Sequence, residues 1–285
     1  EHQTSYVSKH HFSFVESSEV MMTNIKRVQQ AIVEGETYQV NYTARLTDNI
    51  YYPISTLYER LTQFSNGNYT ALLQTDEIQV ASISPELFFQ KGQFNNVDNV
   101  IISKPMKGTM PRGKTEAEDQ QYYKTLQTSS KDRAENVMIV DLLRNDIGRI
   151  SQSGSIKVYK LFFIEACKTV FQMTSMVSGT LKTNTDLTQI LTSLFPCGSI
   201  TGAPKLNTMK YIKQLESSPR GIYCGAIGLL LPTEDDKMIF NIPIRTIEYK
   251  YGQAIYGVGA GITIDSKPKD EVNEFYAKTK ILEML

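Results

Sequence analysis

Runs of alternating polar and apolar residues follow one another closely in this chain, and their order constrains the fold more than any other feature. The runs are rich in valine, isoleucine, threonine and tyrosine, which favour strands. They cover residues 37–46, 69–73, 78–83, 87–90, 154–161, 168–181, 223–231, 238–249 and 253–264. Because many of them are separated by short segments, they predict hairpins and hence largely antiparallel sheets.

Helical patterns are inserted among these runs instead of following every strand. Apolar spacing predicts helices over residues 18–32, 54–64, 114–149, 186–194, 206–215 and 269–285. The longest of these should break near Ser129-Ser130. This order favours an α+β fold, with antiparallel sheets in a sandwich and helices on the outside, over a doubly wound parallel sheet. We expect a tail or edge strand over residues 1–16 and a single large domain over residues 17–285.

Composition argues against several classes of function. Lys plus Arg and Asp plus Glu each total 30, so a net charge of zero offers no field for nucleic acid or an anionic membrane. No apolar run approaches the roughly 18 residues of a membrane span, and we expect no secretory leader. The cysteines, Cys167, Cys197 and Cys224, match neither a disulfide framework nor a zinc pattern, which is typical of reduced thiols in a cytoplasmic protein.

Histidine occurs only near the start of the chain, at His2, His10 and His11. A histidine-based triad or zinc site in the body of the chain is therefore excluded. Acid–base chemistry must come from carboxylates, lysines, tyrosines or water.

Lys107 stands between a proline and a glycine in the stretch Lys104-Pro-Met-Lys-Gly-Thr-Met-Pro-Arg-Gly113, after the apolar run 100–102. Proline and glycine predict a rigid turn that another group can approach closely. A lysine held in this way could serve as a nucleophile or a base. Taken alone, the stretch also fits an ordinary basic loop after a strand.

Two pairs of carboxylates have helical spacing. Asp132 and Glu135 are three residues apart on one predicted helix, and Glu271 and Glu274 repeat this spacing on the C-terminal helix. Two helices that each present such a pair could form a site for a hard cation such as Mg²⁺. Each pair alone also fits a solvated helix face with basic neighbours.

Three further features could contact a ligand. The small-residue loop over residues 195–205 opens a helix, whose first N–H groups bind anions, but it lacks the spacing of a nucleotide P-loop. Gly257-Val-Gly-Ala-Gly261 continues as a strand, which argues against a Rossmann turn. Arg245 could bind a carboxylate through its guanidinium. A tight turn, a strand and a surface arginine are the structural alternatives.

In one order, and over about residues 17–285, these segments resemble the chorismate-utilising enzymes. The matching motifs are Gly35-Glu-Thr-Tyr-Gln-Val-Asn-Tyr-Thr43, Ser84-Pro-Glu86, Pro105-Met-Lys-Gly-Thr109, residues 132–148, residues 196–205, Tyr223-Cys-Gly-Ala-Ile-Gly228, Ile244-Arg-Thr246, Gly259-Ala-Gly261 and residues 271–278. Lys107 together with the 196–205 loop resembles the branch that forms 4-amino-4-deoxychorismate for para-aminobenzoate and folate. Anthranilate synthases have alanine in place of this lysine, and isochorismate and salicylate synthases have a different loop.

The resemblance implies roles for individual residues. Lys107 would attack the ring of chorismate, and Glu86 would be the general base or acid. The ligands implied for Mg²⁺ are Glu135 and Glu274, with Asp132 and Glu271 supporting through water. The residues implied in substrate binding are Thr109, Gln172, Thr201, Gly202, Arg245, Tyr256, Gly259, Gly261 and Lys278. Ammonia would be used free or come from a separate glutamine amidotransferase subunit.

The chain departs from the family at Gln172, where many members have a histidine near the C4 hydroxyl of the substrate. Glutamine can hydrogen-bond that hydroxyl but cannot protonate it. Anthranilate, isochorismate or salicylate synthesis are alternative activities. A decayed chorismate-binding module is the alternative outside enzymes, although the retained Lys107, Glu86 and carboxylate pairs argue against decay.

Overall fold

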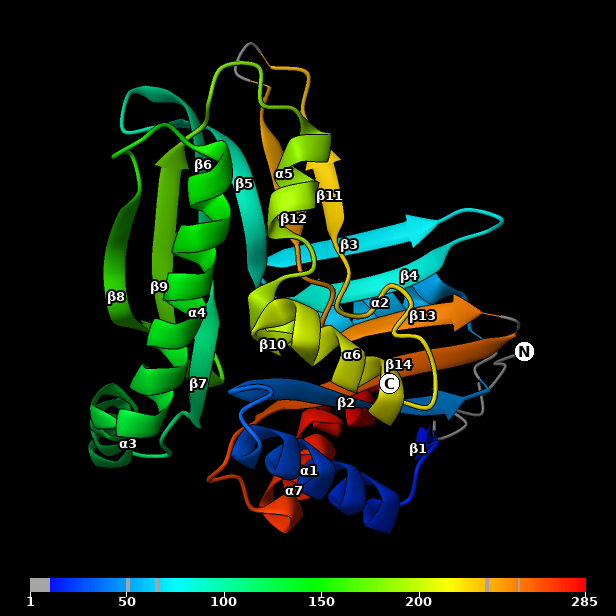
Figure 1. Cartoon of the computed structure of the whole chain (residues 1–285). Coiled ribbons are helices and arrows are strands. Elements are labelled where there is room, and N and C mark those ends of the chain that lie inside the picture. Colours follow the sequence, from blue (N-terminus) through cyan, green and yellow to red (C-terminus); the bar gives the residue numbers. More distant parts are fainter. Residues whose placement is uncertain (1–10, 50–51, 65–66, 234–235, 251) are drawn as a thin grey trace.

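Two antiparallel sheets, each of seven strands among the described residues, form the framework (Figure 1). The structure, a computed structural model, describes residues 11–49, 52–64, 67–233, 236–250 and 252–285. The first sheet contains β1 (Ser13–Phe14), β2 (Gln39–Asp48), β14 (Gln253–Ile262), β13 (Thr246–Lys250), β4 (Gln79–Ser84) and β3 (Tyr69–Gln74) in spatial order, and β10 (Gly202–Ala203) also pairs with β2. The second contains β11 (Ile227–Leu230), β12 (Met238–Asn241), β5 (Leu87–Phe94), β6 (Val97–Lys104), β9 (Val170–Thr180) and β7 (Met106–Pro111), and β8 (Lys157–Ala166) pairs with β9.

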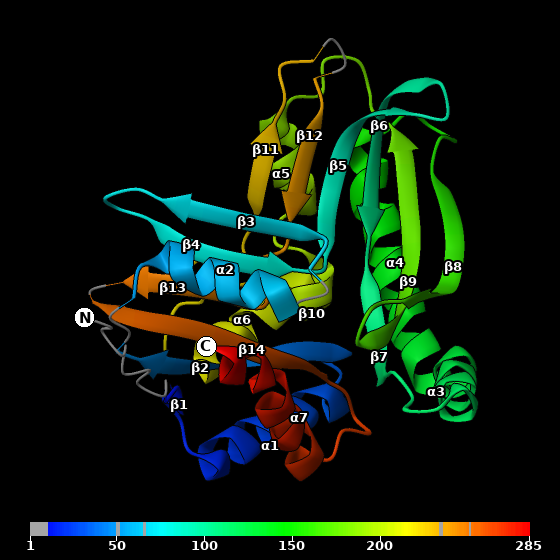
Figure 2. The same ribbon diagram turned by 180° about the vertical axis from the view of Figure 1, so that it is seen from behind.

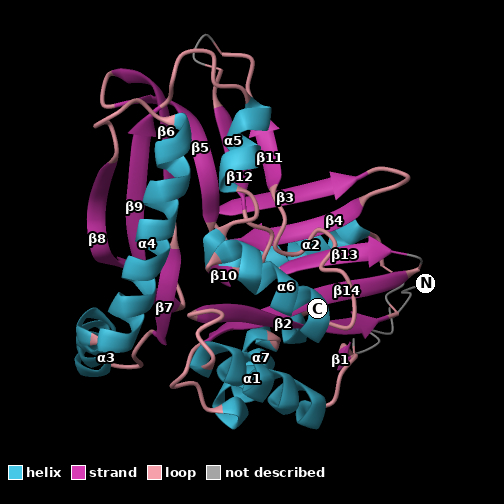
Figure 3. Cartoon of the chain, in the orientation of Figure 1, coloured by secondary structure: helices cyan, strands magenta, loops and turns pink. Residues whose placement is uncertain are grey.

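Helices cover the sheets, as Figures 2 and 3 show. The first sheet contacts α1 (Ser18–Val33), α2 (Ile54–Phe64), α6 (Lys205–Leu215) and α7 (Pro268–Lys278). The second contacts α3 (Glu116–Thr128) and α4 (Ser130–Ile150), and α5 (Leu187–Leu194) packs on α4. Two 3₁₀ turns, Gly198–Ile200 and Lys280–Met284, complete the elements. The expected α+β fold with antiparallel sheets is confirmed.

The described helices include none that is both long and apolar enough to cross a lipid bilayer. At the N-terminal side, β1 pairs with the edge of the first sheet through Ser13 and Phe14. Residues 1–10 of the expected tail lie outside the described residues.

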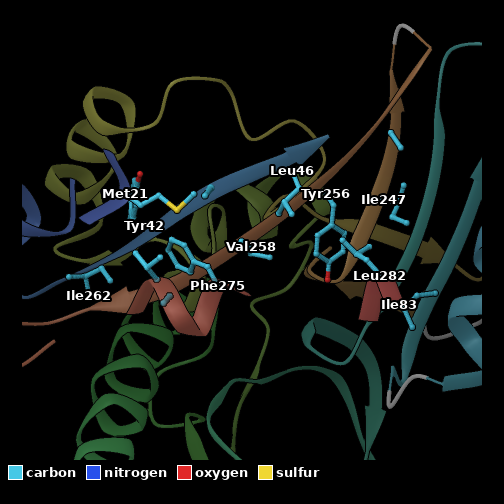
Figure 4. Packing of buried hydrophobic residues seen from close by; sticks show 14 of the residues in the cluster. Met21, Tyr42, Leu46, Ile83, Ile247, Tyr256, Val258, Ile262, Phe275 and Leu282 are labelled. Carbon is cyan, nitrogen blue, oxygen red and sulfur yellow. The ribbon is translucent and has the colours of Figure 1, made fainter. Parts of the chain in front are cut away.

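Strand β2 is buried on both faces, and its two faces differ in chemistry. Val40, Tyr42, Ala44 and Leu46 belong to the hydrophobic core between the first sheet and helices α1, α2 and α7. Figure 4 shows Tyr42 in this core near Met21, Val258 and Phe275. The alternate residues, Gln39, Asn41, Thr43 and Arg45, are also buried but polar. Because strand side chains alternate, this polar row lies on the face opposite the core.

The predicted break in the long helical stretch is confirmed. Ser129 ends α3 and caps α4, since its backbone is extended and its hydroxyl accepts a hydrogen bond from the Asp132 N–H at 3.2 Å. The helix expected over residues 18–32 is observed as α1, and Gly35 follows its end with a φ of +78°.

Two local predictions were wrong. Residues 238–249 are not one strand, because β12 and β13 belong to different sheets and the chain crosses between them at residues 242–245. Pro243 has no N–H for a ladder, and Arg245 has a left-handed backbone with a φ of +50°. Lys107 does not lie in a turn but in strand β7. Strands β6 and β7 are separated by Pro105, and they pair with successive parts of the same strand, β9.

Candidate functional site

The site forms where the chain crosses from one sheet to the other. One crossing, Ser84-Pro-Glu86, joins β4 to β5, and the other, residues 242–245, joins β12 to β13. The Ile242 N–H donates to the Glu86 carbonyl at 3.1 Å, and the Ser84 hydroxyl donates to the Ile242 carbonyl at 2.6 Å. These bonds join the two crossings, and the Glu86 carboxyl is buried beside them, with the residue 4% exposed.

The Glu86 carboxyl accepts a hydrogen bond from the Ser199 hydroxyl at 2.8 Å. Burial raises the pKa of Glu86 to about 7, although the Ser199 bond and the charge of Lys107 both lower it. A carboxyl with a pKa near neutrality can both give and take a proton, as a general acid–base catalyst must. The resemblance implied the role of Glu86, whereas Ser199 had no predicted role.

Lys107 reaches from the second sheet toward the first. A Cβ built on Gly261 of β14 would lie 3.4 Å from the Lys107 Nζ atom, so the amine approaches the glycine backbone closely. Strand β7 is irregular here, with a register shift between Met106 and Thr109 and a φ of +87° at Gly108. A Cβ on Gly108 would come within 2.9 Å of the Asp132 carboxyl carbon, so only glycine lets this bulge pack against α4.

Gln39, which sequence analysis did not single out, lies beside Gly261 on the polar face of β2. A Cβ on Gly261 would overlap the Gln39 Nε2 atom. The Gln39 Oε1 atom is buried without a hydrogen-bond partner among the described residues. Burial of an acceptor without a hydrogen bond costs free energy, so this is a position where a ligand can supply the missing donor. The alternation over residues 37–46 was the available signal, because it places Gln39 opposite the core.

The two carboxylate pairs come from α4 and α7 and act on each other electrostatically. Burial raises the pKa of Glu135, and Asp132 and Glu271 raise it further. Burial also raises the pKa of Glu271, with Glu274 adding to it and a 2.6 Å bond from the Ser266 hydroxyl opposing it. Asp132 and Glu135 are half-buried, Glu271 is buried and Glu274 is exposed. Carboxylate oxygens are the ligands that a hard cation requires. Within the described part of the chain, no three such ligands converge as they stand.

Lys278 lies next to this cluster. Its Nζ atom pairs with the Glu274 carboxylate at 2.7 Å and donates to the Gly259 carbonyl at 2.5 Å. Tyr256 is instead part of the hydrophobic core, and its hydroxyl donates to the Lys278 carbonyl at 3.4 Å. Tyr256 therefore supports α7 through this bond, and burial raises its pKa to about 12.

The loop before α6 is fastened to β2. The Asn41 N–H donates to the Thr201 carbonyl at 2.7 Å, and the Thr201 hydroxyl donates to the Cys197 carbonyl at 2.8 Å. Gly202 pairs with Val40, and its φ of +135° and the nearby Gln39 carbonyl leave no room for a side chain. Thr201 and Gly202 thus shape the loop that carries Ser199.

Thr109 and Gln172 face each other across β7 and β9. Gln172 is buried and accepts a weak bond from the Cys167 thiol at 3.9 Å, whereas Thr109 is exposed. Neither side chain has a hydrogen bond to Glu86 or Lys107 among the described residues. Arg245 is half-buried at the second crossing, and its carbonyl accepts from the Ile83 N–H at 3.0 Å.

Comparison with known proteins assigns the family. The sequence profile described as "chorismate binding enzyme" matches residues 1–284. The chain belongs to the chorismate-binding enzymes.

The relatives of this chorismate-binding enzyme include proteins named for two different activities. Aminodeoxychorismate synthase component 1 of Bacillus subtilis is 39% identical over 254 residues, which are 89% of this chain and 53% of that protein. Anthranilate synthase component 1 3 of Haloarcula marismortui is 34% identical over 260 residues, 90% of this chain and 50% of that protein. The chain thus spans about half the length of these relatives.

A solved structure supports the fold assignment. Anthranilate synthase component I from Streptococcus pneumoniae superposes with a TM-score of 0.86 at 28% identity. The match covers 97% of this chain and 60% of that one.

Proposed function

We propose that this chorismate-binding enzyme converts chorismate and ammonia into 4-amino-4-deoxychorismate. The observation that carries the proposal is the position of Lys107, whose amine lies at the Gly261 backbone and whose charge acts on both Glu86 and Glu135. A lysine needs a proton acceptor to become a nucleophile, and the Glu86 carboxyl, whose pKa is near neutrality, could take up the proton of the nearby Lys107 amine. The similarity to an aminodeoxychorismate synthase component supports the same activity.

In the proposed reaction, the Lys107 amine forms a bond to ring carbon C2 while the bond from C4 to its hydroxyl breaks. Glu86 in its protonated form donates a proton to the departing hydroxyl, which leaves as water. Ammonia then forms a bond to C4, the bond from C2 to Lys107 breaks, and the surplus ammonium proton passes to Glu86. Arg245, Lys278 and the Gly259 and Gly261 backbone would hold the two substrate carboxylates.

Glu135, Glu274, Asp132 and Glu271 would hold Mg²⁺. A bound Mg²⁺ would polarise the ring through the substrate carboxylate, which supplies Lewis-acid chemistry that the side chains lack. Burial is the main cause of the raised pKa values of Glu135 and Glu271, and metal binding would relieve the carboxylate repulsion that adds to it.

The three cysteines of this chain are not suited to releasing ammonia from glutamine. Burial raises the pKa of the Cys197 thiol to about 12 and that of Cys224 to about 11, and burial also raises the pKa of Cys167. Glutamine hydrolysis through a cysteine needs a reactive thiolate, which none of these environments favours. The relatives named as component 1 of aminodeoxychorismate synthase support a glutamine amidotransferase partner as the source of ammonia. The free acceptor on Gln39 would receive a hydrogen bond from the incoming ammonia.

The product of the reaction tests the proposal. Purified protein would be incubated with chorismate, Mg²⁺ and excess ammonium at mildly alkaline pH, and the products would be identified by mass spectrometry. We expect amino-deoxychorismate, which a lyase converts into para-aminobenzoate. Anthranilate, isochorismate or salicylate would instead assign the chain to another branch of the family, and absence of turnover with an amidotransferase present would contradict an aminating enzyme.

Magnesium binding gives a test without turnover. Glu135→Gln and Glu271→Gln are each expected to weaken Mg²⁺ binding by about tenfold or more, because each removes one anionic donor. Since the pKa values of both carboxyls are raised, acidification should weaken binding in the parent protein, as protons compete with the metal. Calorimetric titration with Mg²⁺ alone measures both effects.

Asp141→Asn is the matched control for these variants. Asp141 is also a carboxylate of α4, but it is exposed and paired with Arg144 at 2.9 Å. Its replacement should leave Mg²⁺ affinity unchanged. Equal affinity in all three variants would show that the helix carboxylates do not bind the metal.

A further inference from the structure

The segment over residues 216–224, between α6 and β11, contacts several parts of the site, although none of its residues has a role in the proposed reaction. The Glu216 carboxylate accepts from the Thr43 N–H of β2 at 3.1 Å. The Cys224 N–H donates to the Pro243 carbonyl in the second crossing at 3.1 Å. The Tyr223 ring fills the space where a Cβ on Gly257 of β14 would lie.

Arg220 is the centre of these contacts. Its Nη1 atom donates to the Ile200 carbonyl at 2.6 Å, and its Nη2 atom donates to the Asn41 carbonyl at 2.7 Å. Its Nε and Nη2 atoms also bind the Glu216 carboxylate, at 3.0 and 2.7 Å. Both side chains of this ion pair are largely buried. The planar guanidinium fork thus joins a loop carbonyl to a strand carbonyl while its charge is neutralised.

The two carbonyls belong to residues next to the reacting groups. Ile200 follows Ser199, whose hydroxyl donates to Glu86. Asn41 pairs with Gly261, the glycine that Lys107 approaches, and its Nδ2 atom donates to the Ile200 carbonyl at 3.1 Å. The Ile200 carbonyl therefore receives bonds from both Arg220 and Asn41, which fixes the Ser199 loop against β2.

We propose that Arg220 is a positioning residue, which keeps the Ser199 hydroxyl on the Glu86 carboxyl by fastening the Ile200 carbonyl to β2. The inference rests on the proposed function for the role of Glu86 in proton transfer, but the fastening itself does not. Lysine at this position keeps the charge beside Glu216 but lacks the fork that reaches two carbonyls at once.

The first test compares pH profiles of kcat for Arg220→Lys, Ser199→Ala and the double variant. Arg220→Lys should lower kcat by about tenfold with KM changed less than about twofold, since the substrate-binding groups are untouched. The part of the kcat–pH profile that follows the titration of Glu86 is called here the Glu86 limb. Both single variants should move this limb to higher pH, because the Ser199 bond that lowers the Glu86 pKa is weakened or lost. The other titratable groups that face Glu86, Lys107 and Cys197, remain in place.

The double variant should shift the limb no further than Ser199→Ala alone, because both changes act through one bond. Arg144→Lys, on the exposed Arg144–Asp141 pair of α4, is the matched control and should leave kcat, KM and the limb unchanged. The proposal would be overturned by an unshifted limb in Arg220→Lys or by additive shifts in the double variant. Loss of cooperative thermal unfolding in Arg220→Lys would also overturn it.

Hydrogen exchange supplies a readout that is independent of activity. In Arg220→Lys, peptides over residues 39–43 and 197–203 should exchange faster than in the parent, while peptides over residues 88–102 in β5 and β6 should not change. Unchanged exchange in the first two peptides would contradict the fastening, whatever the enzyme makes. A parent protein that makes no amino-deoxychorismate but shows the exchange effect would separate failure of the proposed function from failure of this inference.

Discussion

Replacing Lys107 by alanine is expected to abolish formation of 4-amino-4-deoxychorismate, with kcat lowered by roughly 10³-fold or more, because the variant has no amine to attack the ring. Lys107→Arg should be equally inactive, since a guanidinium stays protonated and is a poor nucleophile. Initial rates measure the loss. Intact mass spectrometry of the parent, quenched with chorismate but without ammonia, should detect an adduct of chorismate less one water, and Lys107→Ala should lack it.

Lys114→Ala is the matched control for this result. Lys114 lies a few residues further along the chain and is exposed, and its N–H donates to the Glu118 carboxylate at 2.9 Å. Its replacement by alanine keeps that N–H and should leave both rate and adduct unchanged. Parent-like turnover in Lys107→Ala would refute the covalent route.

Replacing Glu86 by glutamine should lower kcat by roughly 10²- to 10⁴-fold, the usual contribution of a positioned acid–base group. The same variant should gain stability at alkaline pH. Burial raises the pKa of Glu86 from 4.5 to about 7, so between these values the native state retains a proton that the unfolded state releases. Native stability therefore falls as pH rises through this window, and above it the buried charge costs about 3 kcal/mol.

Because glutamine carries no charge, the melting temperature of Glu86→Gln should exceed that of the parent above pH 7 and approach it below pH 4.5. Thermal melts across this range measure the difference. Glu77→Gln, at an exposed position in the β3–β4 turn, should follow the parent at every pH. If the melting temperatures of the parent and of Glu86→Gln changed with pH in the same way, the Glu86 carboxyl would not be buried in its charged form.

Much of the secondary structure could be predicted because its signals are local. The helix break at Ser129 is a capping effect within a few residues, and the paired spacing of Asp132 and Glu135 follows from helical periodicity. The same locality explains the error over residues 238–249. The alternating pattern continues through the crossing, whereas the bonds that define the crossing come from Ser84 and Glu86, far away in the sequence.

The site was predicted unevenly for a related reason. Lys107 and the carboxylate pairs could be predicted because their residue types alone indicate what chemistry they can perform. Ser199 and Gln39 are ordinary polar residues whose importance depends on what lies beside them, Glu86 in one case and Gly261 in the other. The substrate contact that the resemblance implies for Tyr256 stays a prediction, since its ring belongs to the core and its hydroxyl donates to the Lys278 carbonyl.

Local sequence determines the strands, the helix caps and the identity of the reactive groups, because hydrogen-bonding patterns and side-chain periodicity act over a few residues. The close approach of Lys107 to Gly261, the neutral-range pKa of Glu86 and the repulsion between the carboxylates of α4 and α7 depend on tertiary structure alone. Burial and electrostatic coupling arise from groups that are distant in sequence, and these groups meet only when the two sheets pack.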